Sequence, residues 1–521
     1  MKMIIAVIVS LLSGAVGLCY ELLWYRVLSY ASGGTPSSFG LLLGFYLAGL
    51  AAGGFMVARG SRRPSANSSS EHLRNIGILA LLANVTGYAV IPTAAWMAEG
   101  GAWWSVFPLI ALSTSLLGIV LPLVTSYAVQ VDRLAGLNLS FVYFGNIVGA
   151  AAGSFVTGYV LMELLPIEKI ALIVAWLGLA LTAGVILVAD MPRRQVIPWI
   201  AGLTGIAALA AELTPRVYDR LFERLLYKQH SPTAGRFVKT VETRAGVVSV
   251  TTSGHVFGGG VYDGTANTDM GHDANNIYRA YALAALHPAP REVLIIGIAS
   301  GGWSQVVSHL PGVEQVTIIE INRGYLELIP ALPRVASLLR NGKVTVVIDD
   351  GRRWLRRNPD RRFDLIVSNT TFHWRAHATN LLSAEFLGLI RSRLHPGGVY
   401  FYNTTASPDA VVTGLASFKH AFRVSNFLAL SDSPIEPDPQ AWYRRVLGML
   451  IDGEPAVPQN DSMALAKLET LTQLMHAPGT NAEAVFERDS SLRARLRDAR
   501  IVTDDNMRVE WRQTFVRQWL P

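Results

Sequence analysis

Cysteine is almost absent from this sequence, and charge is scarce along its first part. Cys19 is the one cysteine among 521 residues, so disulfides within one chain and thiolate metal sites are excluded. Charged residues, 16% of the chain, are rare from Met3 to about Leu213, where long apolar stretches alternate with short polar loops. Stretches of this kind are typical of membrane-spanning helices and not of a water-soluble domain.

Seven apolar stretches are predicted to form helices in a membrane. They lie at about residues 3–24, 37–58, 75–98, 104–130, 138–162, 168–189 and 196–213. Most are long enough to cross a hydrocarbon core about 30 Å thick, but the last is short and has Pro198 near its start, so it either spans or lies along the interface. Small residues at Gly145, Gly149 and Gly153 suit close packing of helices.

Basic residues gather in the loops after the second, fourth and sixth stretches, for example Arg59, Arg133 and Arg193. The loops after the third and fifth stretches carry Glu99 and Glu163 instead. Because basic loops stay in the cytoplasm, seven crossings would place the rest of the chain outside, away from intracellular nucleotide cofactors. We therefore predict a multi-pass protein of the inner cell membrane with a cytoplasmic soluble part, which requires that the last stretch does not cross.

The rest of the chain is charged, and its apolar runs have the length of strands. The sequence predicts a membrane domain with six to seven helices, a connector, a β-lobe with a lead-in helix, a nucleoside-binding α/β domain and a helical or irregular extension, in this order at residues 1–213, 214–236, 237–290, 291–430 and 431–521. Strands and helices alternate in the fourth part, which predicts a doubly wound, Rossmann-like sheet. The basic loops explain part of the formal net charge of +7, so no nucleic-acid binding is predicted.

The most informative segment reads REVLIIGIASGG. Its apolar run suits a buried parallel strand, and Gly297, Gly301 and Gly302 allow a tight turn at the start of a helix, where a ligand can bind. Ser300 lies within this turn. Glu320 ends the next strand about 20 residues later, where a carboxylate can accept both ribose hydroxyls of a nucleoside. Glycines are also typical of any tight strand-to-helix turn, but the acid favours a nucleoside site.

Two further patches follow predicted strands of the sheet. Asn322 comes shortly after Glu320, and Asp349, Asp350 and Gly351 follow the third strand. Because ligands bind at the carboxyl ends of parallel strands, these residues are predicted to line one crevice. Adjacent acids before a helix suit a helix cap, and a carboxylate there can in addition accept the amino group of adenine.

These motifs together resemble the spermidine synthases, the polyamine aminopropyltransferases, over about residues 237–430. The resemblance is carried by HPAPREVLIIG, the glycine turn, the acid at Glu320, an Asp-Gly pair, FDLIV and a Leu-His-Pro-Gly-Gly turn. The pattern GAVGLCYELLWYRVL near the start is similar to that of multi-span members. The resemblance implies a transferase of polyamine biosynthesis that moves an aminopropyl group from decarboxylated S-adenosylmethionine to a diamine, and it suggests a homodimer.

The chain departs from the family pattern where the family holds amines. Asn369 stands where the resemblance implies an aspartate that deprotonates the attacking amine, and Ser300 where it implies an acid for the amine of the co-substrate. Phe372 replaces a second acid, and Asn275 and Asn276 match a Tyr-Gln pair. Without the acids the pocket loses its preference for cations, so ordinary S-adenosylmethionine, and with it methyl transfer or another alkyl transfer, becomes an alternative.

If the chain is active, its base must be another side chain. His373 and His377 in FHWRAH are the nearest titratable candidates, although loop histidines often make only surface hydrogen bonds. Two histidines are too few for a metal site, so no metal is predicted. Asn369 and Thr370 can orient an acceptor by hydrogen bonds without taking a proton.

Tyr262 and Asp263 in GGGVYDG either close the acceptor pocket from the β-lobe or belong to a glycine-rich hairpin. Our leading hypothesis is a membrane-anchored transferase, in contact with the lipid bilayer, that passes an aminopropyl or other alkyl group to a small-molecule or lipid acceptor. The alternatives are an S-adenosylmethionine-dependent methyltransferase, a nucleoside-sensing module associated with transport, and an enzyme that has lost its activity.

Overall fold

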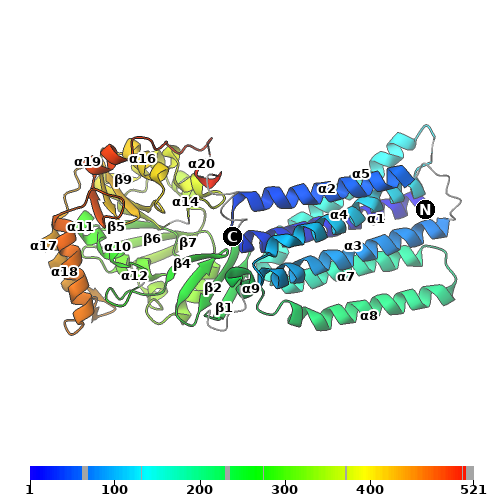
Figure 1. Cartoon of the computed structure of the whole chain (residues 1–521), viewed down its shortest axis with the longest axis horizontal. Helices are drawn as coiled ribbons and strands as arrows, with labels where there is room; N and C mark the ends of the chain where they lie inside the picture. Colours follow the sequence, from blue (N-terminus) through cyan, green and yellow to red (C-terminus); the bar gives the residue numbers. More distant parts are fainter. Residues whose placement is uncertain are drawn as a thin grey trace. The chain divides into compact units, whose positions relative to one another are not determined.

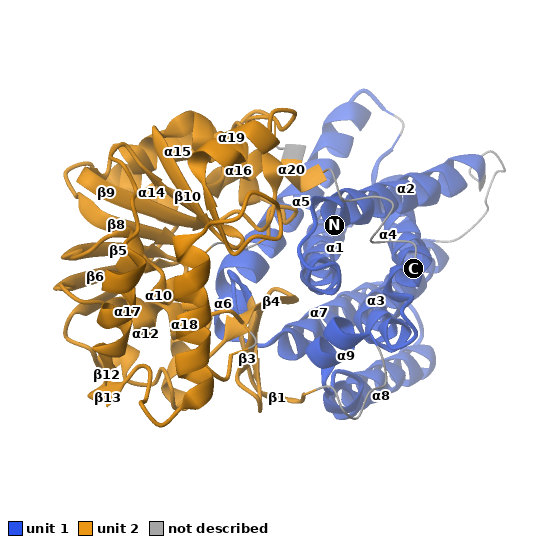
Figure 2. Cartoon of the chain, turned by 60° about the vertical axis from the view of Figure 1, so that its left-hand side comes forward, with its two compact units in different colours: residues 1–234, 242–246 blue, residues 235–241, 247–521 orange. Residues whose placement is uncertain are grey.

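The chain divides into two compact units (Figure 2). The computed structural model describes residues 1–60, 69–130, 132–228, 235–273, 275–369, 372–506 and 508–511. Unit 1 comprises Met1–Ala234 with Glu242–Gly246, and unit 2 comprises Gly235–Val241 with Val247–Pro521.

Unit 1 is a bundle of long helices that lie side by side (Figure 1). Among the described residues, seven helices are long and apolar enough to cross a membrane. They are α1 Lys2–Ala31, α2 Pro36–Gly60, α3 Ser69–Ala98, α4 Phe107–Ala128, α5 Ala135–Phe155, α7 Ile167–Leu187 and α8 Arg193–Val217. The short pieces of the unit are η1 Trp103–Val106, η2 Val156–Leu161, α6 Met162–Leu164 and α9 Leu221–Tyr227. The prediction of seven apolar helices is confirmed.

Helix α5 packs against α1 through glycines. A Cβ at Gly153 would lie 2.7 Å from the carbonyl oxygen of Ala15, and one at Gly145 would lie 3.1 Å from that of Val7. Gly149, between them, also faces the backbone of α1. The two backbones approach too closely for larger side chains, so the predicted role of these glycines in helix packing is confirmed.

Helix α8 corrects the prediction that the last apolar segment is short. It has 25 residues instead of the 18 expected from the apolar pattern, and Pro198 and Pro215 both lie inside it. Near its end, Thr214 shares a hydrogen bond of 2.6 Å with the hydroxyl of Tyr88 on α3. Beyond it, Arg224 on α9 pairs with Glu99, which follows α3, at 2.6 Å. The helix therefore runs along the bundle and ends beside the acidic loop, and its length no longer argues against a crossing.

Unit 2 begins with a small sheet of four strands. These are β1 Phe237–Thr243, β2 Gly246–Thr251, β3 His255–Gly258 and β4 Val261–Thr265, in this spatial order. Apolar and polar residues alternate in them, which suits an antiparallel sheet with one buried face. Two short helices follow, α10 Tyr278–Tyr281 and α11 Leu283–Leu286. They end before Pro288 and Pro290, since proline cannot continue a helix.

The main sheet has eight strands in the order β14-β10-β11-β9-β8-β5-β6-β7. The parallel strands are β5 Glu292–Ile296, β6 Gln315–Glu320, β7 Val344–Ile348, β8 Phe363–Ser368 and β9 Leu394–Asn403. The antiparallel edge consists of β10 His420–Val424, β11 Phe427–Ser431 and β14 Phe486–Arg488. The helices around the parallel strands are α12 Gly302–Ser308, α13 Gly324–Leu328, η3 Ile329–Ala331, η4 Leu338–Arg340, α14 Gly351–Arg357, η5 Ala378–Leu381, α15 Ala384–Arg391 and α16 Pro408–Ser417.

The central strand β5 is apolar along most of its length because both of its faces are buried. Val293 and Ile295 belong to one buried apolar cluster, whereas Leu294 and Ile296 belong to another. Side chains alternate between the faces of a strand, so both faces of the sheet are covered and the predicted doubly wound fold is confirmed. After β5 the chain places β6 and then β7 on one side of it, and later β8 and then β9 on the other side. Such a switch point opens a ligand crevice at the carboxyl ends of the strands.

The last ninety or so residues add to this domain. Their elements are β12 Leu450–Ile451, β13 Glu454–Pro455, α17 Pro439–Leu447, α18 Ser462–His476, α19 Asp489–Arg495, α20 Arg508–Trp511 and the edge strand β14. Trp442 on α17 is fully buried, and its indole donates to the carbonyl oxygen of Tyr281 at 2.8 Å. The extension thus covers the lead-in helices.

Candidate active site

The turn after β5 needs glycine at several positions. Gly297 and Gly301 have φ of 88° and 80°, in the left-handed region, which glycine adopts without a steric cost. A Cβ at Gly302 would lie 2.6 Å from the carbonyl oxygen of Asn267, so no other residue fits there. Ser300 is buried, and its hydroxyl donates to the carbonyl oxygen of Thr265 at 2.9 Å. The turn therefore brings the start of α12 close to the loop after β4.

Glu320 ends β6, directly beside this turn. Its carboxylate accepts the backbone N–H of Ile298 and that of Asn322, each at 2.8 Å, and its side chain is only 4% exposed. Burial raises the pKa of Glu320 to about 7. Each carboxylate oxygen has a further lone pair, so the residue can still accept hydroxyl groups while it holds the turn. Asn322 in turn accepts the N–H of Gly324 at 2.9 Å.

The acids after β7 have separate contacts. Asp350 caps α14 by accepting the backbone N–H of Arg353 at 2.7 Å, so the predicted cap is confirmed for this residue. Asp349 accepts the backbone N–H of Asp350 at 2.7 Å and pairs with the Arg353 side chain. Gly351 packs against β5, because a Cβ there would lie 2.7 Å from the side chain of Ile296. A contact of either acid with adenine stays a prediction.

A cavity of about 310 Å³ lies at the carboxyl ends of β8 and β9, between the β-lobe and the glycine turn. Five residues that the sequence predicted for the reactive end line it together: Tyr262, Asp263, Asn275, Asn369 and Phe372. Three lining residues hold left-handed backbones without being glycine, namely Ala299, Thr405 and Ala406, with φ of 48°, 48° and 60°. Backbone strain of this kind clusters at functional sites.

Other predicted residues lie beside the cavity or outside the described part. Ser300 and Asn276 are not among its lining residues, and Asn276 is exposed with φ of 57°. Thr370 and Thr371 lie outside the described residues. The structure thus brings five of the predicted residues together at the cavity, and the role of each stays a prediction.

Known proteins with similar sequences bear on this crevice. Residues 281–420 match the spermine/spermidine synthase domain. Polyamine aminopropyltransferase 2 from Streptomyces coelicolor is 26% identical over 402 residues, which cover 74% of this chain and 70% of that protein. The polyamine aminopropyltransferase of Mycobacterium tuberculosis is 25% identical over 412 residues, with 74% of each chain covered. Residues 281–420 of this chain therefore belong to the spermine/spermidine synthase domain family.

A crystal structure of spermidine synthase in complex with the transition-state analogue AdoDATO covers 46% of this chain and 87% of that chain, at 18% identity and a TM-score of 0.35. The alignments with the two curated relatives are longer than unit 2. The sequence likeness of this spermidine synthase-like protein to those relatives therefore extends into its helical unit.

The side of the cavity next to β8 and β9 is lined by amides. Asn369 ends β8, and its side-chain oxygen accepts from Asn403 at 3.5 Å. Asn426 donates to the same Asn403 at 2.7 Å. Amide groups hydrogen-bond but take no proton at physiological pH, so this row can orient a polar ligand without acting as a base.

Asp263 is the one carboxylate among the described lining residues. Burial raises its pKa, and a nearby Arg375 opposes this rise. The hydroxyl of Tyr325 donates to its side chain. The acid therefore shares its charge with Arg375 and a hydrogen bond with Tyr325, and it keeps lone pairs for a further donor.

The predicted base His373 is near the cavity but does not line it. Its Nδ1 lies 2.5 Å from the hydroxyl of Thr405, which does. Burial lowers the pKa of His373, which keeps the imidazole neutral, as a base requires. His377 is exposed, and its backbone N–H donates to Glu510 at 3.0 Å. A catalytic role of His373 stays a prediction.

Arg279, which was not predicted from the sequence, also lines the cavity. Its guanidinium lies over the rings of Trp303 and Phe427, 5.8 and 5.1 Å from their centroids. Burial lowers its pKa, but an arginine remains a cation in any protein. The signal that could have revealed it is an arginine within the apolar run IYRAYALAAL, where most neighbours are buried.

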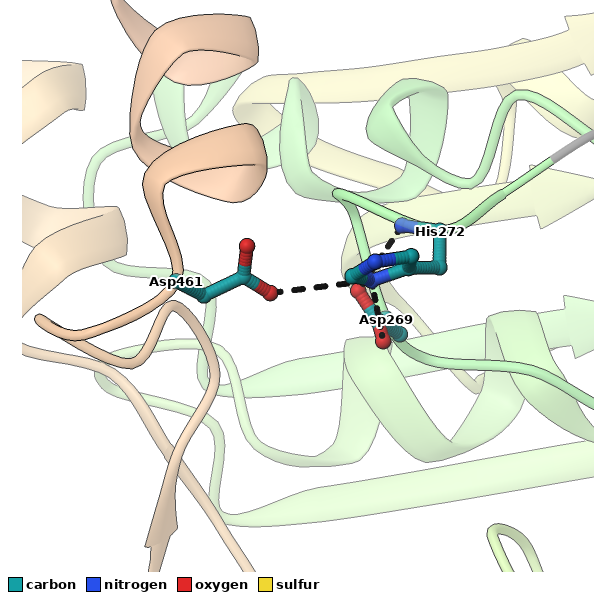
Figure 3. Close-up of side chains that lie close together, drawn as sticks. All are labelled: Asp269, His272 and Asp461. Atoms are coloured by element: carbon teal, nitrogen blue, oxygen red, sulfur yellow. Dashed lines mark hydrogen bonds and ion pairs between the residues drawn. The ribbon is translucent and has the colours of Figure 1, made fainter.

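A second polar cluster lies away from the crevice, where Asp269, His272 and Asp461 face one another (Figure 3). The carboxylate of Asp461 caps α18, and that of Asp269 accepts backbone N–H groups of its own turn at 2.9 and 3.1 Å. Arg334 lies 3.4 Å from Asp269. These contacts explain the cluster as a link between α18 and the loop before α10.

Proposed function

We propose that this chain is a membrane-anchored transferase that binds an adenosyl sulfonium co-substrate and transfers an alkyl group from it. Glu320 carries the proposal, because the glycine turn holds its carboxylate at the switch point where a ribose is bound in such sheets. The relatives named above are polyamine aminopropyltransferases, so aminopropyl transfer from decarboxylated S-adenosylmethionine is the reaction to test first.

The chemistry needs few groups from the protein. A nucleophile attacks the carbon next to the sulfonium, the C–N bond forms, and the C–S bond breaks with its electron pair on sulfur. Methylthioadenosine leaves, and the attacking amine loses one proton to solvent or to a base. Positioning supplies much of the rate in such a displacement, and the cavity next to Asn369 is where the acceptor would lie.

The lining of the cavity limits the acceptor. Diamines are cations, and burying a cation without a carboxylate partner is costly. The row of amides with Asn369 suits a neutral polar acceptor, either a small molecule or the headgroup of a lipid. A second candidate function is nucleoside binding without turnover. It is favoured because Asn369 stands where the family resemblance implies an aspartate that takes a proton.

Product analysis with the purified full chain in detergent separates these functions. Decarboxylated S-adenosylmethionine or S-adenosylmethionine is supplied with candidate acceptors. Release of methylthioadenosine from decarboxylated S-adenosylmethionine would indicate aminopropyl transfer. Release of S-adenosylhomocysteine from S-adenosylmethionine would indicate methyl transfer. If methylthioadenosine itself does not bind in calorimetry, the adenosyl site is refuted.

We further propose that the seven helices anchor the chain in the inner membrane and that unit 2 is cytoplasmic. This side is favoured by the intracellular supply of the co-substrate alone, because α8 is long enough to cross and the basic loops argue for the opposite side. Asp360 is exposed on unit 2, and Arg59 is exposed at a basic loop. We expect cysteines introduced at both positions to be protected from an impermeant thiol reagent in intact cells, which requires that α8 does not cross, because seven crossings put Arg59 and unit 2 on opposite sides. Labelling at Arg59→Cys alone would mean that α8 crosses and that unit 2 is still cytoplasmic. Labelling at Asp360→Cys alone would place unit 2 outside.

A further inference from the structure

We propose that Arg279 binds the carboxylate of the methionine tail, so that the co-substrate is S-adenosylmethionine and not its decarboxylated form. The inference rests on the proposed adenosyl site and names the ligand of its reactive end. Arg279 lines the same cavity as Trp303, at the start of α12, and Asn369, at the end of β8. Its charge therefore faces the space that the tail of the co-substrate would occupy.

The contacts of Arg279 leave donors free. Its Nε donates to the carbonyl oxygen of Asn276 at 2.9 Å, and Nη2 donates to that of Asn275 at 2.5 Å. Nη1 donates to the side-chain oxygen of Asn426. A guanidinium carries five N–H donors, so one on each terminal nitrogen remains. Two such donors are the set that binds a carboxylate in a bidentate manner.

The partners of Arg279 are neutral. Two are backbone carbonyls and one is a carboxamide, and none of the ion pairs found among the described residues involves it. Asp273, the acid that lies nearest in the chain, uses its carboxylate on the N–H groups of Asn275 and Ile277. Asp273 still attracts the guanidinium electrostatically, without an ion pair. The rings of Trp303 and Phe427 offset a further part of the cost of burying this cation.

The two forms of the co-substrate differ at one group. Both carry an amine on the tail, but only S-adenosylmethionine carries a carboxylate beside it. Ser300 stands where the family resemblance implies an acid for that amine, and Asp263 is already held by Tyr325. The cavity therefore offers the amine fewer acids than the family pattern implies, with Asp263 as the one carboxylate among its described lining residues, and Arg279 offers a contact to the carboxylate.

This recognition changes the group that can be transferred. If a nucleophile attacks the tail carbon next to sulfur, a 3-amino-3-carboxypropyl group moves to it. The C–S bond breaks, its electron pair stays on the sulfur of methylthioadenosine, and the nucleophile loses a proton to solvent or a base. Attack on the methyl carbon instead leaves S-adenosylhomocysteine.

Calorimetric titration of the full chain in detergent tests the assignment. The probes are S-adenosylmethionine, its decarboxylated form and methylthioadenosine, which lacks the tail. We expect S-adenosylmethionine to bind at least about tenfold more tightly than the decarboxylated form, as a charge-assisted contact implies. Arg279→Gln should remove this preference and leave the affinity for methylthioadenosine within about twofold.

Two controls separate recognition from a structural role. Arg291→Gln removes an exposed arginine that pairs with Glu314 at 2.9 Å, and it should change none of the affinities. Arg279→Lys keeps the charge but loses the paired donors, so an intermediate preference is expected. A loss of methylthioadenosine binding in Arg279→Gln would show that the residue only holds the loop, and would overturn the proposal.

The wild-type protein decides the question even if the variants do not fold. Equal affinities for the two sulfonium compounds, or tighter binding of the decarboxylated form, would overturn the role of Arg279 while leaving the adenosyl site intact. Absence of methylthioadenosine binding would instead refute the proposed function as a whole.

Discussion

The two ends of the crevice in unit 2 are built on opposite principles. At the adenosyl end, carboxylates are held in place by backbone N–H groups, as Glu320 is by Ile298 and Asn322 and Asp350 is by Arg353. At the proposed reactive end, four carboxamides and one arginine line the cavity, with Asp263 as the single carboxylate among its described lining residues. Under the proposed function, the contact with the nucleoside depends on the same turn that forms the fold, whereas the charge around the cavity can change without disturbing that turn.

The largest expected effect comes from Glu320→Gln. The amide has a single acceptor oxygen, so it loses one contact to a ribose hydroxyl and turns N–H donors toward the buried N–H groups of Ile298 and Asn322. We expect the affinity for methylthioadenosine to fall by about a hundredfold or more, measured by calorimetry. The melting temperature should fall as well, because a buried donor is left unpaired. Unchanged affinity would break the distinction between the two ends, since the adenosyl end would then not depend on its acid.

A smaller effect is expected at the other end from Asn369→Asp. The carboxylate would offer a partner for a cationic acceptor and a group that can take its proton. We expect release of methylthioadenosine from decarboxylated S-adenosylmethionine, with the diamine putrescine as acceptor, to rise about tenfold. Asn403→Asp, in the same row of amides, is the matched control. If neither variant gains activity, the cavity is not a nearly intact polyamine site.

The affinity for methylthioadenosine should depend on pH through Glu320. The pKa of Glu320 is raised to about 7 by burial, and the ionised form is the better acceptor for hydroxyl groups. The ionised fraction rises about tenfold between about pH 6 and about pH 8, so the affinity for methylthioadenosine should rise by up to that factor. Titrations at several pH values check this, and a flat profile in Glu320→Gln would assign the dependence to this residue. A fall in affinity with rising pH would contradict the assignment.

Features formed by neighbouring residues could be predicted from the sequence, whereas features that depend on distant segments could not. The glycine turn and Glu320 could be found because strand, turn and acid follow each other locally, and the helix cap at Asp350 follows from its position before Gly351. The length of α8 could not, since its last turns contain Glu212 and Arg216 and are fixed by contacts with α3 and not by apolarity. Arg279 could not be predicted to line the cavity, because Asn426 and the rings of Trp303 and Phe427 that surround it come from distant segments.

The smallest effect tests whether Asp350 belongs to the adenosyl end or only to its helix. Asp350→Ala removes the cap of α14, and loss of such a cap costs about 1 kcal/mol of stability. Asp438→Ala, which removes the cap of α17 outside the crevice, should cost about as much. Chemical denaturation measures both. If Asp350 also accepts from adenine, only its variant should weaken methylthioadenosine binding, by about tenfold. Equal binding in the two variants would confine the adenosyl end to Glu320 and the glycine turn, because the cap would then account for everything that Asp350 does.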